Sequence, residues 1–182
     1  MSSSRVLTLA FLRPSADDHW MNRLTASPWI SRYPFCHVEL YFEGQGQAFS
    51  IMWGETAGLR AKSMANPQYH LVSVCVSTGE YDKALQFCRA VSSQGIIFDD
   101  WGMAQSVFPC TCMERNSQQK GSSFCSKVIT EALQFGGIRE VEDLSPSSAT
   151  PSRLFECFRA SQRLVCNSVP FKRQAFLMFS QL

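Results

Sequence analysis

The residue with the clearest chemical potential is a cysteine at the start of a predicted helix. Residues 121–137 have the pattern of a loop, one amphipathic helix and a glycine stop. Ser122 or Ser123 can accept hydrogen bonds from the free N–H groups that open a helix, and the glycines at 136–137 can end one. Cys125 then lies in the first turn, where the helix dipole favours an anion and lowers a thiol pKa below ~8.5. Cys125 is therefore either a thiolate nucleophile or a buried structural cysteine.

A cysteine nucleophile needs a base and a group that orients the base, and the chain has three histidines. His19 lies in a polar helical stretch and fits a solvated charge cluster, whereas His70 begins a predicted strand and fits a structural role. His37 differs because it shares a strand face with Glu39, about 6.6 Å further along the strand. Two interpretations remain open, namely an edge strand with a wet face and a functional site.

The elements that must position these residues are mostly strands in the first half of the chain. Residues 35–42 alternate with period two, which predicts a strand with His37 and Glu39 on one face. A glycine-containing turn at 43–46 makes residues 47–53 the antiparallel partner. Alternation and capping patterns further predict strands at 6–12, 59–62 and 69–76, and helices that open at Ser15, span 80–92 and span 151–158.

Composition limits the class of protein. The 182 residues are 45% apolar and 18% charged with a formal charge of +2, which suits one domain over residues 1–182. The scattered basic residues give no nucleic-acid groove, and no apolar run approaches the ~20 residues needed to cross a bilayer. We therefore expect small molecules or proteins as partners, no nucleic acid and no membrane span. The oligomeric state is not predicted.

The eight cysteines indicate a reduced protein and not a disulfide framework. The N-terminal segment lacks the pattern of a secretion signal, so we expect a cytoplasmic, intracellular protein with free thiols. Cys110 and Cys112 form the single close pair, and their one-residue spacer is poor for zinc. We expect no metal and no cofactor.

Five segments in a particular order resemble a known family. The chain resembles the circularly permuted papain-like proteins of the NlpC superfamily, in which the histidine strand precedes the cysteine helix. Relatives of this kind occur in bacteria, phages and large DNA viruses, which would extend the intracellular setting to infected host cells. The resemblance covers roughly residues 5–158 and rests on Phe-Cys-His-Val-Glu-Leu-Tyr-Phe (35–42), Gly-Gln-Ala-Phe-Ser (46–50), Gly-Ile-Ile-Phe-Asp (95–99), Ser-Phe-Cys-Ser-Lys-Val (123–128) and Thr-Pro-Ser-Arg-Leu (150–154).

The resemblance assigns roles by position. Cys125 matches the nucleophile, His37 the base and Asp99 a structural aspartate, while the backbone N–H of Cys125 would serve as oxyanion donor. Ser50 occupies the third polar position, where many members have histidine, asparagine or glutamate. Glu39 could supply the missing charge. We favour Ser50 as the orienting group, because side chains two apart on one strand point in parallel and rarely bond each other.

The resemblance implies an α+β, permuted papain-like fold, with a central antiparallel sheet packed against the helix that carries Cys125. The expected function is a cysteine hydrolase, a peptidase or amidase, that forms a thioester from a peptide, isopeptide or other amide or ester substrate. The lack of a membrane segment favours amide bonds over lipid acyl transfer. A thiol acyltransferase, or an inactive papain-like fold that binds a protein partner, are the alternatives.

Overall fold

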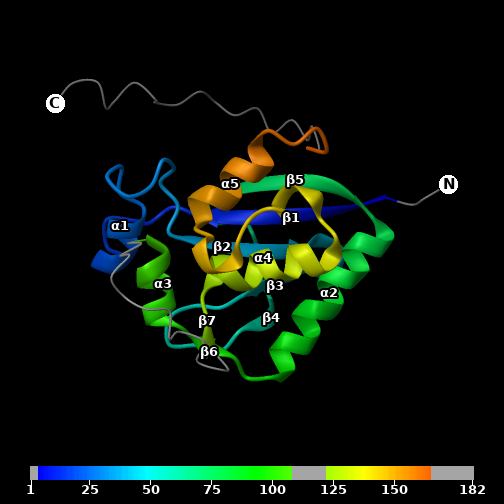
Figure 1. Ribbon diagram of the computed structural model, residues 1–182, viewed down its shortest axis with the longest axis horizontal. Helices are drawn as coiled ribbons and strands as arrows, with labels where there is room; N and C mark the ends of the chain where they lie inside the picture. The colour runs from blue at the N-terminus through cyan, green and yellow to red at the C-terminus, as the bar shows by residue number, and fades with distance from the viewer. Residues whose placement is uncertain (1–3, 108–121, 165–182) are drawn as a thin grey trace.

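A five-stranded antiparallel sheet occupies the centre of the molecule (Figure 1), which the computed structural model describes for residues 4–107 and 122–164. The strand order β4-β3-β2-β1-β5 places β1 and β2 inside the sheet and β4 and β5 at its edges. With the helices that accompany it, this sheet gives the expected α+β class. The strands are β1 (Ser4–Leu12), β2 (His37–Phe42), β3 (Gln47–Ser50), β4 (Gly58–Ala61) and β5 (Tyr69–Ser77).

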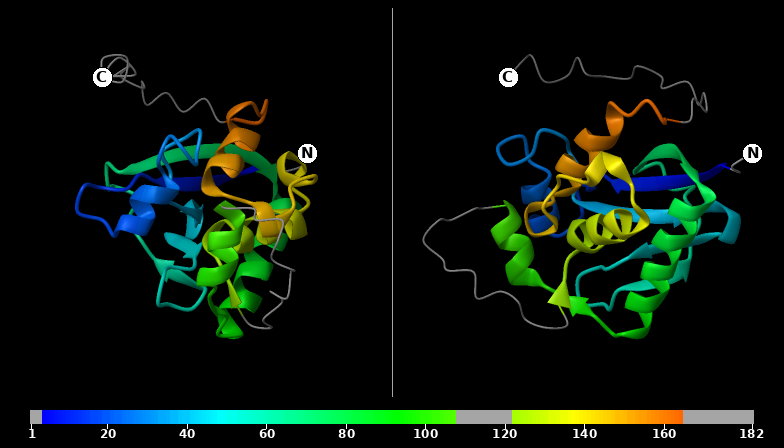
Figure 2. Two further views of the ribbon diagram at one scale, coloured as in Figure 1. Left: turned by 60° about the vertical axis from the view of Figure 1, so that its left-hand side comes forward. Right: turned by 45° about the vertical axis from the view of Figure 1, so that its right-hand side comes forward.

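The core lies on one face of this sheet. Alternate residues of the inner strands, such as Leu9 and Phe11 on β1 and Val38 and Leu40 on β2, are fully buried. Helices α2 (Thr78–Ser93) and α4 (Cys125–Gly136) cover that face and belong to the same apolar cluster (Figure 2). Period-two alternation in the strands thus determines which side chains meet the helices.

Helix α4 begins and ends close to the predicted limits, but its cap differs. Neither Ser122 nor Ser123 caps the helix, because these two serines form strand β7 (Ser122–Ser123), which pairs in parallel with β6 (Ile97–Phe98). Phe124 occupies the N-cap position and makes no side-chain cap hydrogen bond. The serine prediction was wrong because the segment is tied into this small sheet, and Cys125 becomes the first helical residue.

The two glycines at the C-terminal end of α4 have different roles. Gly137 has a φ of 79° and ends the helix in the left-handed conformation, as predicted. Gly136 is the last helical residue and sits where α4 crosses α2. A Cβ atom at Gly136 would lie 3.1 Å from the Glu80 carbonyl oxygen and 3.2 Å from the Ala84 Cβ. The absence of a side chain therefore permits the two helices to approach closely.

Three further helices flank the sheet, and α1 is shorter than predicted. The predicted helix from Ser15 was wrong at its start: the Asp18 carboxylate accepts from the Ser15 N–H at 2.6 Å and holds a turn there. The helix begins after His19, whose ring accepts from the Met21 N–H. The additional elements are α1 (Trp20–Thr25), α3 (Asp100–Val107), α5 (Pro151–Arg159) and the 3-10 helices η1 (Glu43–Gln45), η2 (Arg139–Val141) and η3 (Pro146–Ser148).

Other strand and helix boundaries also differ from the predicted ones. Strand β2 starts at His37 and not at residue 35, and β3 ends at Ser50 and not at residue 53. Helix α2 starts at Thr78, two residues early, because Ser77 and Glu80 form a capping box. The predicted loop around Cys110 and Cys112 lies outside the described residues. No helix in the described ranges is long and apolar enough to cross a membrane.

Candidate active site

Cys125 is the first residue of α4 and is 5% exposed. Val128, Ile129 and Ala132 follow it along the buried side of the helix, as the helical spacing predicts. The partial positive charge at the helix N-terminus stabilises the anionic form of a thiol in this position, while burial of the side chain opposes ionisation.

The N-terminus of α4 contacts the first half of β2, because β3 ends before it reaches that part of the strand. The ladder between β2 and β3 covers Leu40, Tyr41 and Phe42, so the first half of β2 has no β3 partner on that side. The sulfur of Cys125 accepts hydrogen bonds from the backbone N–H groups of Val38 and Ser126 there. The early end of β3 thus lets the helix N-terminus reach the beginning of β2.

His37 and Cys125 interact as a coupled pair. Burial favours the neutral form of each group, yet the charges and the side-chain hydrogen bond between them outweigh it. The pKa of Cys125 falls below its ordinary value, and the pKa of His37 rises to about 9. Both shifts favour the thiolate–imidazolium form of the pair, which is the reactive form of a cysteine nucleophile with its base.

Glu39 places a carboxylate next to the His37 imidazole. Its side chain is fully buried, and Oε1 lies 3.4 Å from His37 Nε2. Burial alone would raise the Glu39 pKa, but hydrogen bonding and the charge of His37 lower it to about 2. Because β2 is an inner strand and Glu39 is buried, the interpretation as an edge strand with a wet face is wrong.

Two buried atoms of this pair lack a normal hydrogen bond in the described part of the chain. They are the donor Nε2 of His37 and the acceptor Oε2 of Glu39. Catalytic hydrogen bonds are commonly long in unliganded sites and shorten when substrate binds.

Two residues that the sequence did not suggest hold Glu39 in place. Lys62 Nζ and the Tyr69 hydroxyl each donate to Glu39 Oε1 at 2.6 Å. Lys62 follows β4 and Tyr69 opens β5, so the segment between the two edges of the sheet brings both donors to the carboxylate. Their spacing of seven residues in a polar connection has no recognisable pattern, and only the sheet order reveals their common target.

Ser50 lies beside this network without joining it. The β2–β3 register, extended by one residue past Leu40 and Phe49, places Ser50 opposite Glu39, and its side chain is buried. Within the described residues no hydrogen bond connects Ser50 Oγ to His37. The contact to His37 comes from Glu39, so the expectation that side chains two apart on a strand stay separate does not hold here.

The other polar residues singled out in the sequence have structural environments. Asp99 Oδ1 accepts from the Gly102 N–H at 2.8 Å at the start of α3. His19 caps α1, and His70 packs against the rings of Phe35 and Phe155. Of the three histidines, His37 is the one whose charge and hydrogen bond lower the pKa of Cys125.

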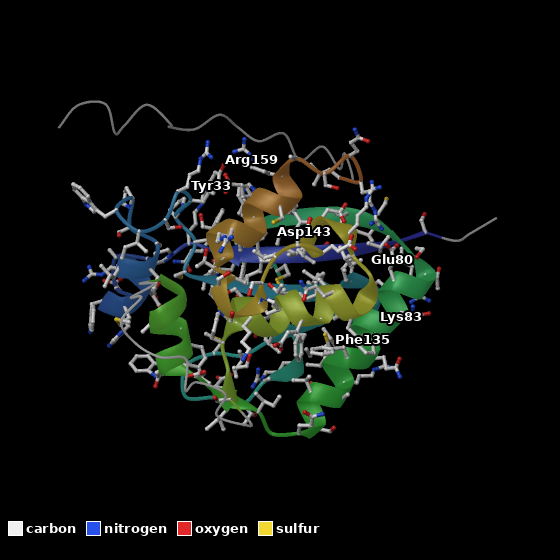
Figure 3. The ribbon with its side chains drawn as sticks, viewed as in Figure 1. Tyr33, Glu80, Lys83, Phe135, Asp143 and Arg159 are labelled. Atoms are coloured by element: carbon white, nitrogen blue, oxygen red, sulfur yellow. The ribbon has the colours of Figure 1, made fainter. Side chains whose placement is uncertain are left out.

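A pocket of about 360 Å³ opens beside Cys125. Two hydrogen bonds connect the segment before β2 to α5 beside the pocket. The Tyr33 N–H donates to Ser152 Oγ at 3.1 Å, and Arg159 donates to the Tyr33 hydroxyl (Figure 3). The pocket is lined by Thr25, Ile30, Ser31, Arg32, Phe35, Cys36, Met103, Phe124, Cys125, Ser126, Ser148, Thr150, Pro151, Ser152, Arg153 and Glu156.

Cys36 is a second thiol in this pocket, and its surroundings make it inert. Burial and the Cys125 charge raise its pKa to about 12, and its sulfur donates to the Leu12 carbonyl. Of the cysteines within the described residues, Cys36, Cys75, Cys88, Cys125 and Cys157 are free thiols, whereas Cys110, Cys112 and Cys166 lie outside those residues.

The described residues contain no group of three or more histidine, cysteine or acidic side chains that could hold a metal ion. The chemical features of the site are a buried thiol with a lowered pKa, a histidine with a raised pKa, a hydrogen-bonded carboxylate and an adjacent pocket. No protein-family model, curated protein or solved structure matches the chain, so the activity of this site must be inferred from its own residues and geometry.

Proposed function

We propose that the protein is a cysteine hydrolase with a permuted papain-like fold, which cleaves an amide or ester bond through a thioester on Cys125. The observation that carries the proposal is the interaction of Cys125 with His37, which lowers the Cys125 pKa and, together with Glu39, raises the His37 pKa to about 9. Structural cysteines in apolar surroundings have raised pKa values, as Cys88 does here.

The residues suggest a sequence of steps. The Cys125 thiolate adds to the substrate carbonyl carbon, and the negative oxygen is stabilised at the N-terminus of α4. The His37 imidazolium then protonates the leaving nitrogen or oxygen as its bond to carbon breaks, which leaves a thioester. Neutral His37 next removes a proton from water, hydroxide adds to the thioester, and the carboxylic acid leaves as the thiolate re-forms. Glu39 stabilises each imidazolium stage.

An activated ester tests this proposal without knowledge of the natural substrate. p-Nitrophenyl acetate should give a burst of one nitrophenolate per chain, with an acetyl group on Cys125 that mass spectrometry locates. Cys125→Ala should abolish the burst, and His37→Ala should lower its rate by at least about 100-fold, the usual contribution of general acid–base catalysis.

The matched control is Cys75→Ala, because Cys75 is an exposed free thiol outside the pocket. This variant should retain the burst. Acetylation spread over several cysteines at similar slow rates would overturn the proposal. Decay of the acetyl-enzyme in water supports a hydrolase, whereas decay only after addition of an amine or alcohol would support the acyltransferase alternative.

A further inference from the structure

Two arginine side chains line the pocket beside Cys125. Arg32 lies in the segment before β2, and Arg153 lies in the first turn of α5. Glu156 is the one acidic residue that lines the pocket within the described part of the chain. Two guanidinium groups and one carboxylate therefore line the same pocket as the proposed nucleophile.

The two arginines differ in how far their charge is already balanced. Arg32 Nη1 lies 2.8 Å from Glu156 Oε1 and forms an ion pair with it. Arg153 Nη1 donates to the Ser148 carbonyl and to Ser148 Oγ at 3.1 and 3.0 Å. No carboxylate of the described residues lies within ion-pair distance of Arg153. A guanidinium group has five donors, so this side chain is anchored at one nitrogen and retains donors for a ligand.

Two hydroxyl groups of the pocket already donate within the protein. Ser31 donates to the Tyr33 carbonyl at 2.7 Å, and Ser126 donates to the Ala149 carbonyl at 2.8 Å. Both hydroxyl hydrogens are thus used within the protein. The Ser152 and Thr150 hydroxyls accept from the Tyr33 and Arg153 N–H groups and keep their own hydrogens for a ligand. An anion would find these donors beside a guanidinium group without a counter-charge.

We infer that the substrate carries a carboxylate close to the bond that is cleaved, and that Arg153 binds this carboxylate while Arg32 adds to the field. The inference rests on the proposed function and names the substrate class of the same site: an acidic peptide-like amide. The reacting carbonyl must meet Cys125, and a planar guanidinium group can bind a carboxylate through two parallel hydrogen bonds. The carboxylate is supplied by an acidic side chain or by a free chain end.

Three alkylating reagents that share one reactive group test the inference. Bromoacetyl-glutamine amide is neutral, bromoacetyl-glutamate amide has a side-chain carboxylate, and bromoacetyl-glutamine with a free acid has a chain-end carboxylate. In each reaction the Cys125 thiolate attacks the CH₂ carbon and bromide leaves. The rate at Cys125 is divided by the rate with 2-mercaptoethanol, a neutral thiol, which removes intrinsic differences among the reagents.

We expect one anionic reagent to label Cys125 roughly two- to fivefold faster than the neutral reagent, as exposed ion pairs allow. The faster of the two identifies the source of the carboxylate. Arg153→Gln should abolish this preference, and Glu156→Gln should increase it because Arg32 loses its internal partner. Arg89→Gln removes the same charge from the exposed surface of α2, outside the pocket, and should leave the preference unchanged.

Equal rates for all three reagents, or a preference that survives in Arg153→Gln, would overturn the inference. Failure of the inference can be told apart from failure of the proposed function, because the neutral reagent alone reports the reactivity of the thiol. A slow neutral rate that His37→Ala leaves unchanged would reject the hydrolase, whereas the ratio between anionic and neutral reagents would still report the charge of the pocket.

Discussion

At the scale of single residues, the groups around Glu39 explain how a buried carboxylate can keep its charge. Glu39 is negative, His37 and Lys62 are positive, and the Tyr69 hydroxyl contributes a neutral donor. A buried carboxylate is costly unless it is paired and hydrogen-bonded. Its two short hydrogen bonds and the adjacent imidazolium account for a Glu39 pKa of about 2 despite burial.

The first prediction separates Glu39 from Ser50. Glu39→Gln should move the pH midpoint of Cys125 alkylation by neutral iodoacetamide upward by about one pH unit, because an opposite charge next to the imidazole is lost. Ser50→Ala should leave that midpoint unchanged, since no hydrogen bond joins Ser50 to His37 in the described residues. The measurement is the labelling rate between pH 4 and pH 10, with roughly half-unit steps. An unshifted midpoint in Glu39→Gln would show that the carboxylate does not act on the ring.

The second prediction concerns the donors to Glu39. Tyr69→Phe should lower the free energy of unfolding by about 1.5 kcal/mol, the lower range for a hydrogen bond to a charged group, because Lys62 remains. Urea denaturation measures it. Tyr41→Phe is the matched control, since Tyr41 is a half-buried tyrosine of β2 whose hydroxyl bonds to no described residue. Equal losses in both variants would contradict a specific role for the Tyr69 hydroxyl.

At the scale of elements, local patterns predicted which segments form strands and helices better than where they start. The strand around His37, the helix after Cys125 and the proline-led α5 were all visible from alternation, spacing and capping residues. The cap of α4 was not, because Ser122 and Ser123 are held by Ile97 and Phe98, 25 residues earlier in the chain. Similarly, Lys62 and Tyr69 acquire a common target only when the sheet is assembled. Contacts between distant segments leave no local pattern.

The third prediction tests the crossing of α2 and α4. Gly136→Ala should destabilise the protein by about 1 kcal/mol, because overpacking against the Glu80 carbonyl and Ala84 exceeds the gain in helix propensity. Gly79→Ala is the control, since a Cβ atom there meets nothing within 4 Å. This second variant should be neutral or slightly stabilising. Thermal unfolding of both proteins measures the difference, and a stabilised Gly136→Ala would show that the helices can separate without cost.

At the scale of the whole molecule, Arg163 joins the consecutive elements β5 and α2 to η2, which lies much later in the chain. Its guanidinium group pairs with Glu80 of α2 at 2.8 Å and with Glu140 of η2 at 3.3 Å, and its Nε donates to the Cys75 carbonyl of β5. The side chain of Arg163 is largely buried, so these bonds are less screened than surface pairs. The segment after α5 thereby holds the helical layer to the edge of the sheet.

The fourth prediction is that Arg163→Gln lowers the free energy of unfolding by about 2 kcal/mol at neutral pH. Arg60→Gln breaks an exposed pair with Glu55 and should cost at most about 1 kcal/mol. The loss in Arg163→Gln should shrink in acid. Burial raises the Glu80 pKa, but backbone and side-chain hydrogen bonds and Arg163 lower it overall. Its contribution is therefore present above the ordinary glutamate pKa and lost below it. A loss that is constant from pH 7 to about pH 3 would contradict the pairing.

The outer edge of β5 has a consequence for the solubility of shortened chains. Within the described residues this edge is covered in its second half, where the Cys75 N–H donates to the Arg163 carbonyl and Val74 forms a bridge with Leu164. A chain cut before Arg163 would present a nine-residue strand with unpaired backbone groups and an exposed Leu71. Open strands of this length recruit strands from other molecules. We therefore expect truncation at this point to cause edge-to-edge association between copies while the site around Cys125 stays folded.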